Sequence, residues 1–169
     1  YVFFQTLILE KSGNLILLTR APDLRQAQNT SNIKDIRIWV DKDGSSPTED
    51  LKIILNELNL KGKTIGIEYE AYGLTGRNAI KLNKSLEDYC EIKDKSELVS
   101  NLRVIKSPEE ISYVRKAAEL ADRALDEVWK NAKAGVSEGK ILAEMQKVIF
   151  ENGGDYPANE FIIGSGHNA

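Results

Sequence analysis

The sequence has very few of the residues that most metal and redox sites require. Its 169 residues include one histidine, His167, and one cysteine, Cys90. An intramolecular disulfide, a CxxC zinc site, an HExxH metallopeptidase helix and a histidine-rich metal site are therefore excluded within this span. A nucleophilic cysteine–histidine pair would have to join these two residues, which lie in very different sequence contexts.

Long apolar runs and an excess of positive charge are also missing. No apolar run approaches the roughly 18–20 residues of a membrane-spanning helix. The formal net charge of -3 at pH 7 gives no electrostatic argument for binding to nucleic acid or to an anionic membrane. The 41% of hydrophobic and 29% of charged residues are typical of a globular chain. The length suits one ordinary domain or two small ones.

Strands and helices are predicted to alternate through the first hundred residues. Residues 2–9 and 15–19 are rich in β-branched, aromatic and aliphatic side chains and flank the turn-forming segment 10–14, which predicts a β-hairpin. Such alternation indicates an α/β layer structure. The other predicted elements are strands at 36–40, 64–68 and 89–92, and helices at 49–58, 75–86 and 96–102.

The sequence changes character after a boundary predicted within residues 99–107. Ser107, Pro108 and Glu110 predict a helix start, because serine can cap, proline suits the first position and glutamate can complete a capping box. The helix ends before Gly135, and its apolar residues form one continuous face: Ile111, Val114, Ala118, Ala121, Leu125 and Val128.

A second helix and a strand are predicted to follow. The helix begins at Ser137-Glu138 and ends at Gly153-Gly154. Residues 160–163 predict a strand, which leads into Gly164-Ser165-Gly166. The second part of the chain is thus expected to read helix, helix, strand.

The run 102–111 and its continuation 114–122 resemble the entry into the pita-bread domain of the Xaa-Pro peptidase and creatinase family. That family reads Leu-Arg-x-Ile-Lys-Ser-x-x-Glu-Ile there, followed by a helix containing alanines. The segments 135–138 and 161–169 look like the next landmarks, the second helix and the first sheet strand with its glycine turn. The preceding α/β part fits the family's N-terminal domain, whose sequence is less distinctive.

This resemblance implies an α/β fold in two parts. Residues 1–102 would form a creatinase-type N-terminal domain, a mixed sheet flanked by helices, incomplete at its N-terminus. Residues 103–169 would form the first two helices and strand of an α+β pita-bread metallopeptidase domain, truncated at its end. The chain is therefore expected to be a fragment of a longer protein.

The resemblance also implies where the chemistry resides. Peptidases of this family bind two divalent ions (Mn, Co or Zn) through two aspartates, one histidine and two glutamates. The two ions lower the pKa of a shared water and polarise the scissile carbonyl. All five ligands come from strands after the glycine turn, so none has a counterpart here. His167 occupies a variable position of the motif and receives no family role. The expectation is that residues 1–169 contain no catalytic residue and no metal ligand, and that the fragment is inactive.

Single residues give weaker signals. Cys90 is predicted to be a small hydrophobic core residue rather than a nucleophile, and His167 an exposed loop residue rather than an acid or base. Gly62-Lys63-Thr64 is rejected as a phosphate loop because Glu57 stands where a glycine is required. Asn29 and Asn83 begin glycosylation sequons, which matter only in a secreted protein.

Two short segments leave alternatives open. The charges Glu109-Glu110 and Arg115-Lys116 are most simply a solvated helix face. Gly164-Ser165-Gly166 lets the backbone turn near a substrate pocket in the family context, so that 161–168 would line that pocket, but a plain hairpin turn is an equal alternative.

Three functions remain open at this stage. The first is a fragment of a Xaa-Pro aminopeptidase- or dipeptidase-like metallohydrolase, whose parent is a cytoplasmic homodimer acting on a peptide or small amide, without nucleic-acid or membrane partners. The second is a small-molecule C–N hydrolase of the same family, like ectoine hydrolase or creatinase, which residues 159–166 favour. The third is a non-catalytic pita-bread binding protein.

Overall fold

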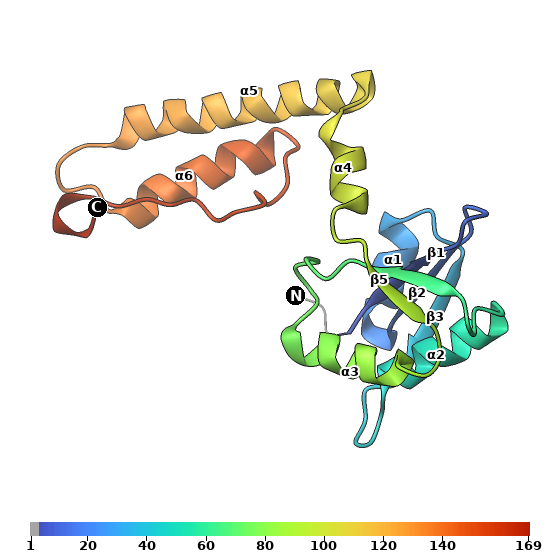
Figure 1. The fold of residues 1–169 in the computed structure, drawn as a ribbon. Coiled ribbons are helices and arrows are strands. Elements are labelled where there is room, and N and C mark those ends of the chain that lie inside the picture. Colours follow the sequence, from blue (N-terminus) through green and yellow to red (C-terminus); the bar gives the residue numbers. More distant parts are fainter. Residues whose placement is uncertain (1–3) are drawn as a thin grey trace. The chain divides into compact units, whose positions relative to one another are not determined.

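The computed structural model describes residues 4–169, and the chain divides into two compact units. Unit 1 comprises Tyr1–Arg103 and unit 2 comprises Val104–Ala169 (Figure 1). The first two residues of the strand predicted at 2–9 lie outside the described residues. None of the described helices combines the length and hydropathy of a membrane span.

The predicted hairpin opens unit 1. Strands β1 (Thr6–Leu9) and β2 (Leu15–Arg20) pair antiparallel, with Leu7 opposite Leu17. Gly13 has a φ of +89° in the connecting turn, a conformation that glycine adopts without a steric penalty. Strand β3 (Asp35–Trp39) pairs parallel to β2, which gives a mixed three-stranded sheet in the order β1-β2-β3.

A separate two-stranded parallel sheet follows. It consists of β4 (Thr64–Ile67) and β5 (Glu91–Asp94). The strand predicted at residues 89–92 therefore lies two residues later. The reason is that the Tyr89 side chain is buried in the core, while its carbonyl oxygen accepts a hydrogen bond of 2.8 Å from the amide of Gly62. The ladder begins only after this turn.

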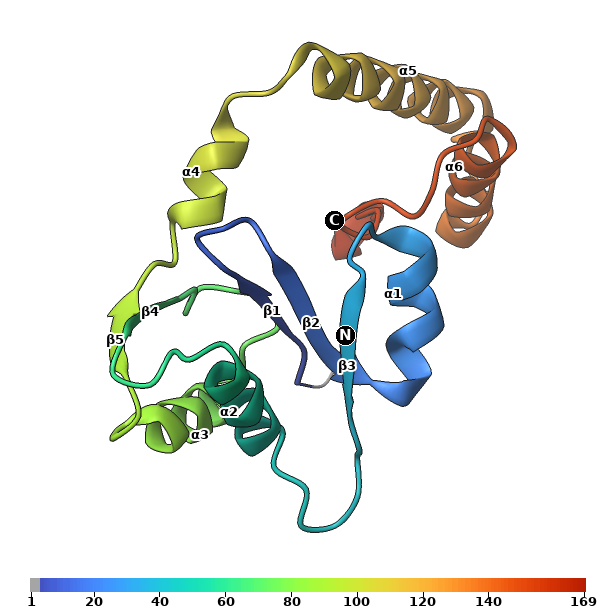
Figure 2. The same cartoon turned by 90° about the vertical axis from the view of Figure 1, so that its right-hand side faces the viewer.

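Helices lie on both sides of the three-stranded sheet (Figure 2). Helices α2 (Pro47–Glu57) and α3 (Gly76–Leu86) were both predicted and lie on one side. Helix α1 (Leu24–Thr30) lies on the other side, after a short 3-10 turn, η1 (Ala21–Asp23). Helix α1 was not predicted from the sequence, because it has no apolar periodicity and Ala27 is its one buried residue.

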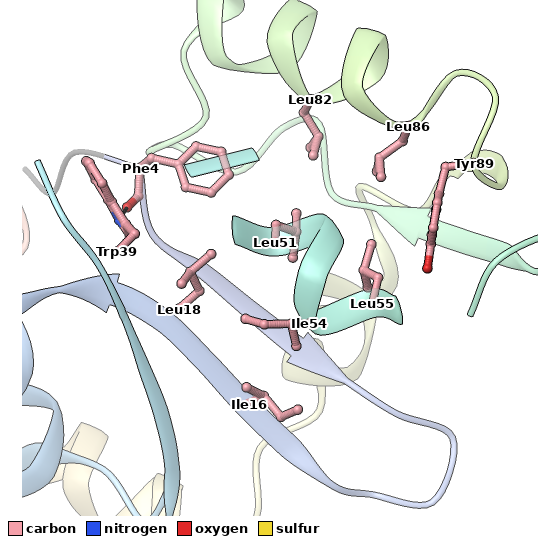
Figure 3. Packing of buried hydrophobic residues seen from close by; sticks show 10 residues of the cluster. All are labelled: Phe4, Ile16, Leu18, Trp39, Leu51, Ile54, Leu55, Leu82, Leu86 and Tyr89. Carbon is pink, nitrogen blue, oxygen red and sulfur yellow. Dashed lines mark hydrogen bonds between the residues drawn. The ribbon is translucent and has the colours of Figure 1, made fainter. Parts of the chain in front are cut away.

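One apolar core joins the elements of unit 1 (Figure 3). The central strand β2 is buried on both faces: Ile16 and Leu18 enter this core, and Leu17 and Thr19 alternate to the opposite face. The indole nitrogen of Trp39 donates a hydrogen bond of 2.8 Å to the carbonyl of Phe4 and ties β3 to the residues before β1. The core consists of Phe4, Ile16, Leu18, Trp39, Leu51, Ile54, Leu55, Leu82, Leu86 and Tyr89.

Helix α4 (Leu98–Val104) ends at the first residue of unit 2, and the next helix is α5 (Pro108–Asn131). The predicted capping box is present at its start. The Ser107 amide donates to Oε2 of Glu110 over 2.7 Å, and the Glu110 amide donates to Oγ of Ser107 over 3.2 Å. Two amides that the helix itself cannot satisfy thus find partners.

Removing this cap tests the assignment of the helix start. We expect Ser107→Ala to lower the free energy of unfolding of unit 2 by about 1 kcal/mol, because one amide loses its acceptor. Urea unfolding followed by far-UV circular dichroism measures the change. Ser107→Asp retains a capping oxygen and serves as the control, and equal losses in both variants would argue against the cap.

Helix α6 (Glu138–Glu151) runs antiparallel beside α5 (Figure 1). Ala124 of α5 and Ile141 and Ile149 of α6 are the buried residues of the two helices. The apolar face that was predicted on α5 is only partly covered. Within it, Val114 and Leu125 remain about half exposed, at 54% and 50%.

The prediction of a strand at residues 160–163 is wrong for this structure. No strand is assigned there among the described residues, and Ile162 is fully exposed. A strand needs a neighbour that accepts and donates its ladder hydrogen bonds, and no strand of unit 2 provides one. The chain instead ends in a second 3-10 turn, η2 (Gly166–Asn168).

Candidate functional site

The glycine segment at residues 164–166 folds back to the beginning of α6. The Ser165 hydroxyl donates a hydrogen bond of 2.6 Å to Oε1 of Glu138, the first residue of that helix. From the sequence, Glu138 was predicted only as part of a helix start, and this contact was not predicted. No sequence signal pairs residues 138 and 165, because the contact depends on the path of the chain between them.

The residues around this segment are mostly open to solvent. His167 lies in η2 and is exposed, as expected of a loop histidine. Phe161 and Ile163 are half-buried, whereas Ile162 points outward. The plain hairpin turn, one of the two alternatives for residues 164–166, does not occur, because neither flank is a strand.

Cys90 lies at the edge of the core of unit 1. Its side chain packs against the buried cluster and is partly buried. Burial raises the pKa of the Cys90 thiol, because the thiolate would lose hydration. A nucleophilic cysteine needs the opposite shift. The environment therefore favours the interpretation of Cys90 as a small hydrophobic residue.

The segment Gly62-Lys63-Thr64 does not form a phosphate site. The Gly62 amide donates to the carbonyl of Tyr89, and the Lys63 amide donates to the carbonyl of Leu60 over 3.1 Å. A phosphate-binding loop needs free amides that converge on the anion. The amides of Gly62 and Lys63 already have backbone partners and are therefore not free to bind a phosphate.

The other sequence candidates have structural partners or lie on the surface. Asn29 and Asn83 are both exposed, and Oδ1 of Asn83 accepts a hydrogen bond of 2.5 Å from the Tyr69 hydroxyl. The predicted charged helix face is exposed at Glu109, Glu110, Arg115 and Lys116, and Glu110 also belongs to the cap of α5. The ammonium of Lys116 lies 5.4 Å from the centre of the exposed Tyr113 ring.

A small polar cluster that was not predicted from the sequence lies where β4 and β5 end. The Ser96 hydroxyl donates to Oδ1 of Asp94 over 2.5 Å and accepts from the Tyr69 amide over 3.0 Å. Hydrogen bonds from Ser96 lower the pKa of the Asp94 carboxyl. These bonds tie together the carboxyl ends of two parallel strands, so the cluster has a structural explanation.

The described residues do not fit a metal centre. No group of three or more His, Cys, Asp or Glu side chains within residues 4–169 is placed to hold a metal ion. The carboxylate of Glu138, which contacts the glycine segment, accepts its hydrogen bond from Ser165. No catalytic step through a metal can therefore be derived from these residues.

Two family models together match nearly the whole chain. The model of the creatinase/prolidase N-terminal domain matches residues 1–105, and that of metallopeptidase family M24 matches residues 112–169. The Xaa-Pro dipeptidase of Pyrococcus furiosus is 31% identical over 107 residues, which is 63% of this chain and 30% of that protein. The chain thus spans less than a third of that relative's length.

Two further proteins are informative. The ectoine hydrolase of Halomonas elongata is 27% identical over 114 residues, which is 62% of this chain and 28% of that protein. The structure of X-Pro aminopeptidase from Thermotoga maritima matches with a TM-score of 0.71 at 22% sequence identity. The match covers 89% of this chain and 38% of that one, and it shows a shared fold. Because the creatinase/prolidase N-terminal model alone covers residues 1–105 of 169, the chain belongs to the family of Xaa-Pro peptidases and creatinases.

Proposed function

We propose that the full-length protein is a Xaa-Pro dipeptidase or aminopeptidase that hydrolyses the bond before proline in short peptides. The observation that carries this proposal is the order of the two family-model matches. The creatinase/prolidase N-terminal match ends at residue 105 and the M24 match begins at 112, beside the division between the two compact units at 103/104.

Within this proposal the two units have different roles. Residues 1–102 form the creatinase-type N-terminal domain, which restricts access to the active site and contributes to the contact of a cytoplasmic homodimer. Residues 103–169 begin the pita-bread domain. Membership of metallopeptidase family M24 implies divalent metal ions in the full-length protein. Since the described residues form no metal site, the ligands are assigned to other parts of that protein.

Metal dependence of the full-length protein tests the proposal. We expect hydrolysis of a Xaa-Pro dipeptide to fall to background after chelation and to return with Mn²⁺ or Co²⁺, because bound divalent ions would activate water and polarise the scissile carbonyl. A dipeptide without proline is the control substrate. Activity that is insensitive to chelation would contradict the mechanism, and calorimetry that finds a tight two-metal site in residues 1–169 would contradict the placement of the ligands.

A second candidate is hydrolysis of a C–N bond in a small molecule such as ectoine. The similarity to the Halomonas elongata ectoine hydrolase over 114 residues supports it. The same protein preparation decides between the two functions. Release of product from ectoine, with no cleavage of Xaa-Pro dipeptides, would favour the second candidate. The reverse result would favour the peptidase.

A further inference from the structure

The end of α6 carries the single Asn-Gly pair of the sequence, Asn152-Gly153. Asn152 is the residue that caps α6, and it is exposed. Its side-chain amide makes two hydrogen bonds: Nδ2 donates to the carbonyl of Val148 over 2.8 Å, and Oδ1 accepts from Nη1 of Arg123 over 2.6 Å. The second bond links α6 to α5.

Asparagine followed by glycine is chemically reactive, because glycine has no side chain to hinder cyclisation. In the reaction the Gly153 nitrogen forms a bond to Cγ of Asn152. The Cγ–Nδ2 bond breaks, and ammonia leaves with the proton of the Gly153 amide. Water then opens the resulting succinimide at either carbonyl, which gives aspartate or isoaspartate. No oxidant or other co-reactant is needed.

The geometry of the helix end opposes this reaction. The Gly153 amide, which must attack, donates a hydrogen bond of 3.2 Å to the carbonyl of Phe150. The Asn152 side chain is held at both its oxygen and its nitrogen, so Cγ cannot rotate freely toward that amide. Gly153 has a φ of +79°, a left-handed conformation that is fixed by the turn. Cyclisation therefore requires these bonds to open.

We propose that Asn152 is a deamidation site whose rate is set by the packing of α5 on α6, and that Arg123 protects it. The product changes the helix end in two ways. A carboxylate at this position is unfavourable at the negative end of the helix dipole, although Arg123 lies within reach to pair with it. Isoaspartate adds one carbon to the backbone between residues 152 and 153, one residue before Gly154, which packs closely against Ile149 and Leu120.

Mass spectrometry of the full-length protein, aged at neutral pH, tests this assignment. The peptide that begins after Lys147 is fragmented to locate conversion of asparagine to aspartate or isoaspartate. We expect slow conversion at Asn152 in the folded protein and rapid conversion in urea. Arg123→Ala is expected to convert about fivefold faster than the unsubstituted protein while folded, the factor that one ordinary hydrogen bond contributes.

Two controls separate this effect from a general loss of structure. Lys116→Ala removes a neighbouring exposed charge of α5 that does not bind Asn152, and it should leave the rate unchanged. Asn159, an exposed asparagine followed by glutamate, reports background deamidation in the same peptide. Equal rates at Asn152 in folded and urea-unfolded protein, or equal rates in Arg123→Ala and the unsubstituted protein, would overturn the proposal.

Discussion

Alanine in place of Leu18 is expected to lower the free energy of unfolding of unit 1 by about 2–5 kcal/mol. Leu18 lies on the central strand β2, is 1% exposed and belongs to the core between the three-stranded sheet and α2 (Figure 3). Truncation removes buried apolar surface and leaves a cavity that the surrounding side chains fill only in part. Such a loss is a large fraction of the stability of a typical domain.

The two tryptophans allow this change to be measured in unit 1 alone. Trp39 is buried in the same core, whereas Trp129 of α5 is 72% exposed, so the change in fluorescence on urea unfolding comes chiefly from Trp39. Leu7→Ala is the matched control, since Leu7 is 54% exposed on the neighbouring strand β1. Leu7→Ala is expected to lower the free energy of unfolding of unit 1 by under about 1 kcal/mol. Similar urea midpoints for the two variants would contradict the placement of the core.

Elements with a local signal could be predicted from the sequence. The hairpin of β1 and β2, the helices α2 and α3 and the capping box of α5 each follow from a periodicity or a turn motif within a few residues. Helix α1 has no such signal, because it has one buried residue, Ala27, and no side-chain cap.

The incorrect strand at residues 160–163 has a related cause. Its apolar sequence is suited to a strand, but pairing is a property of two segments and not of one. Ile162 is fully exposed, and the described part of unit 2 contains no strand to pair with it. Composition alone cannot supply the missing partner.

Long-range contacts around the candidate site could not be predicted for the same reason. The bonds from Ser165 to Glu138 and from Arg123 to Asn152 join residues 27 and 29 positions apart. Each residue type is common on protein surfaces, so nothing in the sequence marks the pairs. What the sequence did predict correctly is the family, because the run 102–111 is a specific motif and not a composition.

Gly154→Ala is expected to destabilise unit 2 by about 1–3 kcal/mol, the usual cost of overfilling a packed position. A Cβ atom at this position would lie 2.6 Å from Cγ2 of Ile149 and 2.9 Å from Cδ1 of Leu120. It would also lie 3.0 Å from the carbonyl oxygen of Ile149, which belongs to the helix backbone and cannot move independently. The α5–α6 contact must therefore loosen.

Gly139→Ala makes the same chemical change at the other end of α6 and should have the opposite effect. Nothing lies within 4 Å of a Cβ atom built at Gly139, and the residue is in the first turn of the helix. Alanine there is expected to stabilise unit 2 by about 0.5–1 kcal/mol, because the unfolded chain loses conformational freedom and helix propensity rises. Far-UV circular dichroism during urea unfolding measures both variants. Opposite shifts of the midpoint would establish that Gly154, and not the helix as a whole, is sterically constrained, whereas equal shifts would contradict the close packing of Gly154 against Ile149 and Leu120.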